Sequence, residues 1–229
     1  MSGKNSSKVK KIVKTVISVF LFLALIFVPA GTLNWPEAWL FFILYILIVV
    51  GLLIWLKKNN PDLLKERMSV KKDVKSWDKI IIVTYTIFLM ILLVITGLDA
   101  VRFRWSNVPF VLKALGFIGF IPAIVFSLWA MVKNTYASSM VRIQENRGHK
   151  TCTTGPYRYV RHPMYVGVII LVLCFPLALG SFYAFIPSSI IAILFVLRTL
   201  LEDKTLKKEL PGYKEYAKKV RYKLIPGIW

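Results

Sequence analysis

The chain has 229 residues, of which 57% are hydrophobic and only 18% charged, and its mean hydropathy is +0.63. This composition is too apolar for an ordinary soluble domain, in which about 25% of residues are charged, and it excludes a disordered chain. Its 31 Lys and Arg against 11 Asp and Glu give a formal charge of +20, but the apolar fraction excludes a nucleic-acid binder. An integral membrane protein remains.

Stretches without Asp, Glu, Lys or Arg mark the predicted membrane spans. Four of them have about the 20 residues that a helix needs to cross a bilayer core of about 30 Å, and they cover residues 15–36, 38–56, 80–98 and 114–132. A fifth, residues 163–197, is too long for one span at about 1.5 Å per residue. Pro176 and Gly180 interrupt it, so we expect two helices that turn near residues 179–181. The sequence predicts an all-α transmembrane bundle of about six spans, the last two forming a short helical hairpin.

The first stretch has a competing interpretation, because lysines before an apolar run are also typical of a secretory signal peptide. The uncharged run is long for such a peptide, and no clear small-residue cleavage site follows it. These features favour a retained span.

The basic residues predict the orientation of the bundle. The tail before residue 15 and the connections 57–79, 133–162 and 198–229 hold 28 of the 31 Lys and Arg. The positive-inside rule therefore places these segments and both termini in the cytoplasm, in a multi-pass membrane protein. The basic surplus is explained by topology and by attraction to anionic membrane lipids, not by nucleic acid.

Two further segments of the cytoplasmic face are expected to be helical. Asn60-Pro61-Asp62 predicts the cap of a short interfacial helix, and the basic amphipathic stretch 203–222 is typical of a surface helix that could also serve as a lid. Glu37 and Asp99 fall on the opposite face, and the sequence assigns them no role.

Polar residues concentrate between positions 141 and 165, which hold both histidines of the chain, four arginines and three tyrosines. Because the hairpin returns to the same face, residues 161–165 and 198–202 should be neighbours and form a polar pocket at the membrane boundary. Arg198 and Glu202 are four apart, so they share one helix face and can pair, although such a pair is also typical of a simple interfacial salt bridge. Two histidines and two cysteines indicate neither a metal site nor a disulfide scaffold.

The pocket residues lie in a recognisable order. The run 155–167, with Arg161-His162-Pro163-Met164-Tyr165 at its centre, is followed by Arg198…Glu202-Asp203 and then Gly212-Tyr213…Tyr216. This order resembles the isoprenylcysteine carboxyl methyltransferase family, and the phospholipid methyltransferases share it. The resemblance is dense over residues 134–229 and loose before them, although 98–105 looks like prokaryotic members. It divides the chain into 1–133, four spans that act as scaffold and possible acceptor gate, and 134–229, a methyltransferase core.

The resemblance implies a membrane methyltransferase that uses S-adenosylmethionine without a Rossmann domain and without a metal, and no G-x-G-x-x-G stretch occurs here. Carried over by motif, the cofactor-binding positions are Gln144, His149, Lys150, Thr151, Cys152, Tyr157, His162, Pro163, Met164, Tyr165, Arg198 and Glu202. Glu202 would take the ammonium or ribose hydroxyls, Arg198 a carboxylate, and the tyrosine rings the adenine or the sulfonium. Asp203 stands where many relatives have a second Glu.

The expected acceptor is lipophilic and enters from the bilayer. An isoprenylcysteine carboxylate is already ionised at pH 7, so Arg161 or Arg198 would position it and no general base is needed; the catalytic candidates are Arg161, Arg198 and Glu202. A phosphatidylethanolamine amine would instead need a base such as Glu202 or His162. Two more distant alternatives are an NADPH-dependent sterol-type reductase and a non-catalytic transporter, and the absence of charges inside the spans disfavours the transporter.

Overall fold

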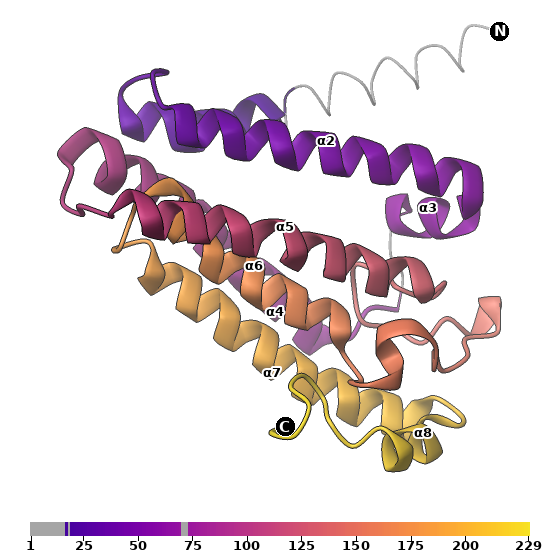
Figure 1. Ribbon diagram of the computed structural model, residues 1–229. Coiled ribbons are helices and arrows are strands. Elements are labelled where there is room, and N and C mark those ends of the chain that lie inside the picture. Colours follow the sequence, from indigo (N-terminus) through magenta and orange to yellow (C-terminus); the bar gives the residue numbers. More distant parts are fainter. Residues whose placement is uncertain (1–16, 18, 70–72) are drawn as a thin grey trace, which may run out of the picture.

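The computed structural model describes residues 17, 19–69 and 73–229, and all regular secondary structure within them is helical (Figure 1). A short apolar helix covers Val19–Ala30. The other elements are α2 (Pro36–Asn59), α3 (Pro61–Met68), α4 (Ser76–Gly97) with a π-helical extension (Leu98–Phe103), α5 (Phe110–Lys133), two 3₁₀ turns (Glu145–Arg147 and Gly155–Arg158), α6 (Pro163–Leu179), α7 (Phe185–Glu209) and α8 (Tyr213–Lys219).

Four of these helices are long and apolar enough to cross a membrane: α2, α4 with its extension, α5 and α7. Together with the shorter apolar helices Val19–Ala30 and α6 they account for the expected all-α bundle of about six spans. The predicted spans 38–56 and 114–132 fall within α2 and α5, and 80–98 falls on α4 and the first residue of its extension. The predicted first span, 15–36, begins outside the described residues, and its helix ends earlier than expected, at Ala30, because Gly31 turns the chain with φ 73°.

The predicted hairpin is confirmed. The last carbonyls of α6 accept from the backbone N–H groups of Gly180 and Ser181, and Gly180 has a φ of 81°, a left-handed conformation that glycine adopts without steric cost. α6 packs against α5 at close range, since a Cβ atom built on Gly167 would lie 2.1 Å from Ser127 Oγ. Small residues at such contacts let two membrane helices approach, and this fixes the start of α6 beside α5.

The hairpin turn is held by a residue for which the sequence predicted no role. Asp99 is fully buried and accepts hydrogen bonds from the backbone N–H of Ser106 at 2.7 Å, from the Ser181 hydroxyl at 2.5 Å and from the Tyr183 N–H at 3.2 Å. Glu37 likewise pairs with a partner far along the chain, Lys113, at 2.7 Å. Both acidic residues therefore join separate spans at the end of the bundle that carries few basic residues.

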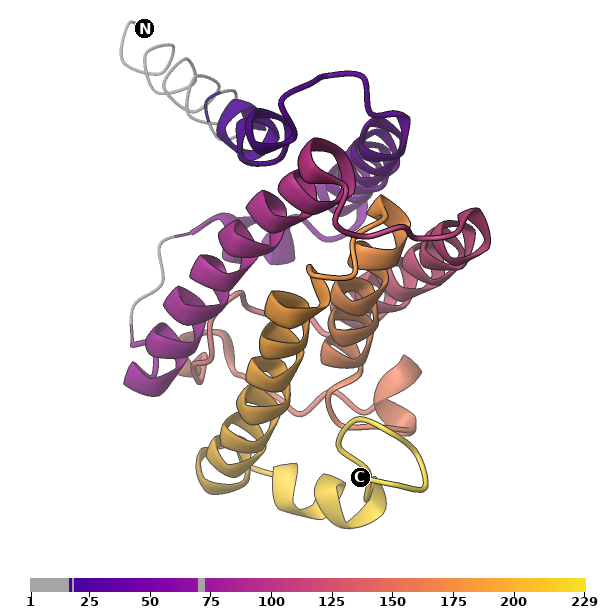
Figure 2. The same ribbon diagram turned by 90° about the vertical axis from the view of Figure 1, so that its left-hand side faces the viewer.

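The opposite end gathers the basic connections (Figures 1 and 2). Arg67 of α3 donates to the carbonyl of Ala137 at 3.2 Å, and Lys75 pairs with Glu209 at the end of α7 at 2.6 Å. The predicted cap of α3 is confirmed, because the Asn60 side chain accepts from the Leu63 N–H at 3.1 Å. Within the described residues the connections 57–79, 133–162 and 198–229 thus lie together at one end.

The amphipathic stretch 203–222 is not the single helix that the sequence predicted. α7 continues to Glu209, and Pro211 and Gly212 then break the helix, Gly212 with a φ of 78°. α8 follows as two turns, and the chain end folds back so that the Trp229 carbonyl accepts from Lys223 and Leu224. The tail consequently packs beside the polar segment before α6 instead of lying apart from it.

Candidate functional site

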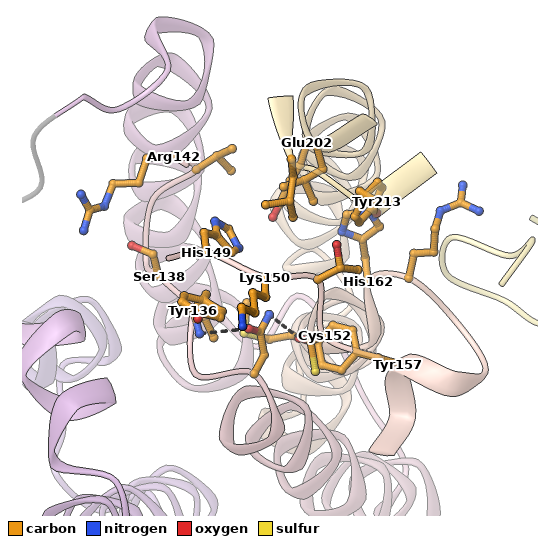
Figure 3. Close-up of a pocket in the computed structure, with 18 of the residues that line it drawn as sticks. Tyr136, Ser138, Arg142, His149, Lys150, Cys152, Tyr157, His162, Glu202 and Tyr213 are labelled. Atoms are coloured by element: carbon orange, nitrogen blue, oxygen red, sulfur yellow. Dashed lines mark hydrogen bonds between the residues drawn. The ribbon is translucent and has the colours of Figure 1, made fainter. Parts of the chain in front are cut away.

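One pocket lies at the basic end of the bundle, between the segment 134–162, the first turn of α6, the last turns of α7, and α8 (Figure 3). Figure 3 shows Glu202, His162 and Tyr213 on one side and Tyr136 and His149 on the other. The lining residues are Asn134, Tyr136, Ala137, Ser138, Met140, Val141, Arg142, His149, Lys150, Thr151, Cys152, Tyr157, Arg161, His162, Met164, Tyr165, Glu202, Leu206, Leu210, Tyr213 and Tyr216.

Most of the residues expected from the sequence meet in this pocket. Those among the lining are His149, Lys150, Thr151, Cys152, Tyr157, Arg161, His162, Met164, Tyr165 and Glu202. Gln144, Pro163 and Arg198 are not among them. Pro163 begins α6, where its missing N–H costs nothing. Gln144 is 1% exposed, donates to the Tyr136 carbonyl at 2.7 Å and accepts from Arg147 at 2.5 Å, so it shapes the loop from behind.

The ion pair expected between Arg198 and Glu202 is not formed. Arg198 instead pairs with Asp78 of α4, with Nε 2.8 Å from the carboxylate, and it also donates to the Ser139 carbonyl at 3.0 Å. Glu202 accepts a 2.5 Å hydrogen bond from the Tyr165 hydroxyl. Four-residue spacing places both side chains on one face of α7, but a buried carboxylate from another span competes more closely for the guanidinium. Glu202 is therefore the carboxylate that faces the pocket.

Arg161 lines the pocket with its donors already engaged. It is 6% exposed and makes four hydrogen bonds, two to the Asp203 carboxylate at 2.7 and 3.3 Å and two to the carbonyls of Val220 and Arg221 at 2.8 and 2.7 Å. Asp203 also accepts from the Tyr213 hydroxyl at 3.0 Å. These contacts tie α7 to the C-terminal tail. They leave Arg161 few free N–H donors with which to hold an acceptor carboxylate, as the sequence analysis expected it to do.

Aromatic rings line the wall of the pocket that the segment 134–162 forms. The rings of Tyr136 and His149 lie 4.6 Å apart at 31°, and the Tyr136 hydroxyl donates to the Gly148 carbonyl at 2.8 Å. Burial, helped by the positive charges of Arg147 and Arg142, lowers the pKa of His149 to about 4. His149 is therefore neutral at pH 7. On the opposite wall burial raises the pKa of Tyr157 and of Tyr213 well above the usual phenol value, so both remain hydroxyl donors.

The polar groups and aromatic rings of the pocket suit a ligand that is both cationic and aromatic. Thr151 Oγ1 is buried, lines the pocket and has no hydrogen-bond partner among the described residues. Such an atom costs free energy unless a ligand or water satisfies it. Glu202 supplies the negative charge, and the rings of Tyr136 and Tyr157 supply faces on which a flat base or a cation can rest. Among the described residues no group of His, Cys, Asp and Glu is arranged to hold a metal ion.

Several lining residues escaped the sequence analysis. Tyr136 and Ser138 precede the conspicuous cluster 141–165, and Leu206 and Leu210 lie in the stretch interpreted as a surface helix. Tyr213 and Tyr216 belonged to the recognised order of residues but received no role; the Tyr216 hydroxyl in fact donates to the Tyr157 carbonyl at 2.7 Å. The spacing of Tyr213 and Tyr216, three residues apart at the start of α8, was the signal that could have identified them as lining residues.

Part of the chain around this pocket is similar to known proteins. The model of the isoprenylcysteine carboxyl methyltransferase family matches residues 114–208, which run from α5 into the last turns of α7. This match covers less than half of the chain. A protein-S-isoprenylcysteine O-methyltransferase from Schizosaccharomyces pombe is 33% identical over 85 residues. That match covers 36% of this chain and 36% of the relative's length.

The matched region contains much of the pocket. Glu202 and the loop from Asn134 to Tyr165 fall inside it, whereas Leu210, Tyr213 and Tyr216 come from the tail beyond. This match to a methyltransferase family points to a methyl donor, and together with the four apolar helices it indicates a multi-pass membrane protein.

Proposed function

We propose that the chain is an integral membrane methyltransferase that uses S-adenosylmethionine and methylates a lipophilic acceptor, namely the carboxylate of an isoprenylcysteine-type substrate. The observation that carries the proposal is the pocket itself: the family-matched segment folds around a cavity that presents one carboxylate, Glu202, among tyrosine rings. The name of the yeast relative supports the choice of acceptor.

When bound, S-adenosylmethionine would supply a methyl group from its positively charged sulfur to a nucleophile and leave as S-adenosylhomocysteine. Glu202, steadied by the Tyr165 hydroxyl, would bind the cationic amino group or the ribose hydroxyls of this ligand. Tyr136 and the neutral His149 offer a flat face to its adenine, and Thr151 offers a free hydroxyl. Lys150, Cys152, Tyr157, His162 and Met164 complete the walls. Pro163 and Gln144 act by shaping the backbone.

We assign Arg161 and Arg198 structural roles outside the ligand contacts, in place of the direct contacts expected from the sequence, because carboxylates of the protein already engage both guanidiniums. Since the acceptor carboxylate is ionised at pH 7, transfer needs alignment and exclusion of water more than it needs a base. The spans of residues 1–133 then act as scaffold and acceptor gate, and residues 134–229 form the core. The basic end, with the pocket, faces the cytoplasm of a prokaryotic-type membrane.

Phosphatidylethanolamine is the second candidate acceptor, because its amine would lose a proton to a base and Glu202 faces the pocket with one hydrogen bond, from Tyr165, among the described residues. The two acceptors give chemically different products. A carboxyl methyl ester releases methanol in base, whereas an N-methyl group does not.

The experiment incubates the purified protein in lipid nanodiscs with methyl-labelled S-adenosylmethionine and either S-farnesylcysteine or phosphatidylethanolamine. We expect base-labile label on the farnesylcysteine and none on the phospholipid. Glu202→Gln should lower turnover about tenfold to a hundredfold, the scale of a lost charge-assisted contact. Glu209→Gln is the matched control, since Glu209 lies two turns further along α7, pairs with Lys75 and does not line the pocket. Base-stable label would select the phospholipid, and no label on either acceptor would contradict the proposal.

A further inference from the structure

A buried carboxylate outside the family-matched region packs behind the wall of the pocket. Asp78 lies in the first turn of α4, is fully buried, and accepts from the Val141 N–H at 2.7 Å and from Arg198 Nη2 at 3.1 Å. The Lys75 N–H in addition donates to the Val141 carbonyl at 3.2 Å. The start of α4 thus holds both backbone polar groups of a residue that lines the pocket.

Arg198 stands between two carboxylates. Its guanidinium lies 5.4 Å from the centre of the Tyr165 ring, and the hydroxyl of that same ring donates to Glu202. Asp78 and Glu202 are both close enough for their charge to act on Arg198. Residues four apart on a helix also pair readily. Without the Asp78 charge, the buried guanidinium would have one carboxylate left within reach, and that carboxylate is the one facing the pocket.

We propose that Asp78 is a positioning residue that keeps Arg198 from pairing with Glu202 and so leaves the Glu202 carboxylate to bind the cationic part of the ligand. The choice between the two carboxylates is steric as well as electrostatic. Asp78 offers Arg198 two oxygens while the Ser139 carbonyl accepts from the same Nη2, so the guanidinium is fixed on the α4 side of α7. This inference rests on the proposed function, because it takes S-adenosylmethionine as the ligand.

The test compares four proteins by isothermal titration with S-adenosylmethionine: wild type, Asp78→Asn, Arg198→Gln and the double variant. Asparagine keeps the shape of Asp78 and its acceptor for the Val141 N–H but removes the charge. We expect Asp78→Asn to bind about tenfold to a hundredfold more weakly, because Arg198 then occupies Glu202. The double variant should recover to within about threefold of wild type, since no guanidinium remains to occupy Glu202.

A merely structural Asp78 predicts the opposite ordering, because its variants would lose affinity whether or not Arg198 is present. Unchanged affinity in Asp78→Asn, or a double variant as weak as that single variant, would overturn the inference. If Asp78→Asn is not monodisperse, Arg198→Gln decides alone: affinity within about threefold of wild type supports the proposal, and a tenfold loss shows that Arg198 contacts the ligand and overturns it. A wild type that fails to bind S-adenosylmethionine contradicts the proposed function instead, so the two failures are distinguishable.

Discussion

Neutralising Asp203 should detach the C-terminal tail from the pocket. Asp203 is 3% exposed. Its carboxylate pairs with Arg161 at 2.7 Å and with Lys207 at 2.8 Å, and it accepts a hydrogen bond from the Tyr213 hydroxyl at 3.0 Å. Asp203→Asn leaves the guanidinium of Arg161 buried without a counter-charge. Breaking a buried ion pair in this way costs about 3–5 kcal/mol. For a chain of this size that corresponds to a fall in Tm of roughly 6–20 °C.

The assay is thermal unfolding of the purified protein followed by size-exclusion chromatography, with limited proteolysis to locate the change. We expect new cleavage in the segment 220–229, whose carbonyls at Val220 and Arg221 are held by Arg161. Asp62→Asn is the matched control, because its pair with Lys65 is 3.4 Å long and both side chains are more than three-quarters exposed. Such exposed pairs contribute about 0–1 kcal/mol. An Asp203→Asn protein that melts and resists protease like wild type would refute the reasoning.

Three further outcomes are expected. Gly167→Ala should lower Tm by several degrees, because its Cβ would lie 2.1 Å from Ser127 Oγ, whereas Gly51→Ala should not, since nothing lies within 4 Å there; equal melting points would contradict this packing. Asp99→Asn should open the hairpin turn and speed hydrogen exchange at residues 180–184, and exchange at the wild-type rate would show that Asp99 does not hold it. The pKa of His149 is about 4 in the fold against 6.5 ordinarily, so the stabilisation from its neutral form is fully present above pH 6.5 and is lost as the pH falls through about 4. Ligand affinity measured from about pH 8 to about 5.5 should therefore not fall through protonation of His149. A drop centred near pH 6.5 that His149→Gln abolishes would contradict this assignment.

Much of the bundle follows from the sequence because a bilayer imposes simple rules. Uncharged stretches must be helical to satisfy their backbone groups, so α2 and α5 could be placed within a few residues. Pro176 and Gly180 predicted the hairpin because they interrupt an uncharged stretch that is too long for one span. The end of α7 could not be placed, because an amphipathic pattern continues through Lys207 and only Pro211 breaks it.

The membership of the site was predictable, but its partnerships were not. His162, Tyr165 and Glu202 stand in a recognisable order, and the hairpin brings them together. Spacing on α7 alone favoured a pair between Arg198 and Glu202, because nothing in the order of residues reveals that Asp78 arrives from 120 positions away. Long-range contacts of this kind depend on how the helices pack, which local patterns do not encode.

The central claim is that the pocket binds a methyl donor, and it is tested most directly by titrating the purified wild-type protein with S-adenosylmethionine and, separately, with NADPH. The claim predicts saturable binding of S-adenosylmethionine that is weakened in Glu202→Gln and retained in Glu209→Gln, with no binding of NADPH. Binding of NADPH in place of S-adenosylmethionine would point to a reductase, and S-adenosylmethionine binding that is unchanged in Glu202→Gln would contradict the site.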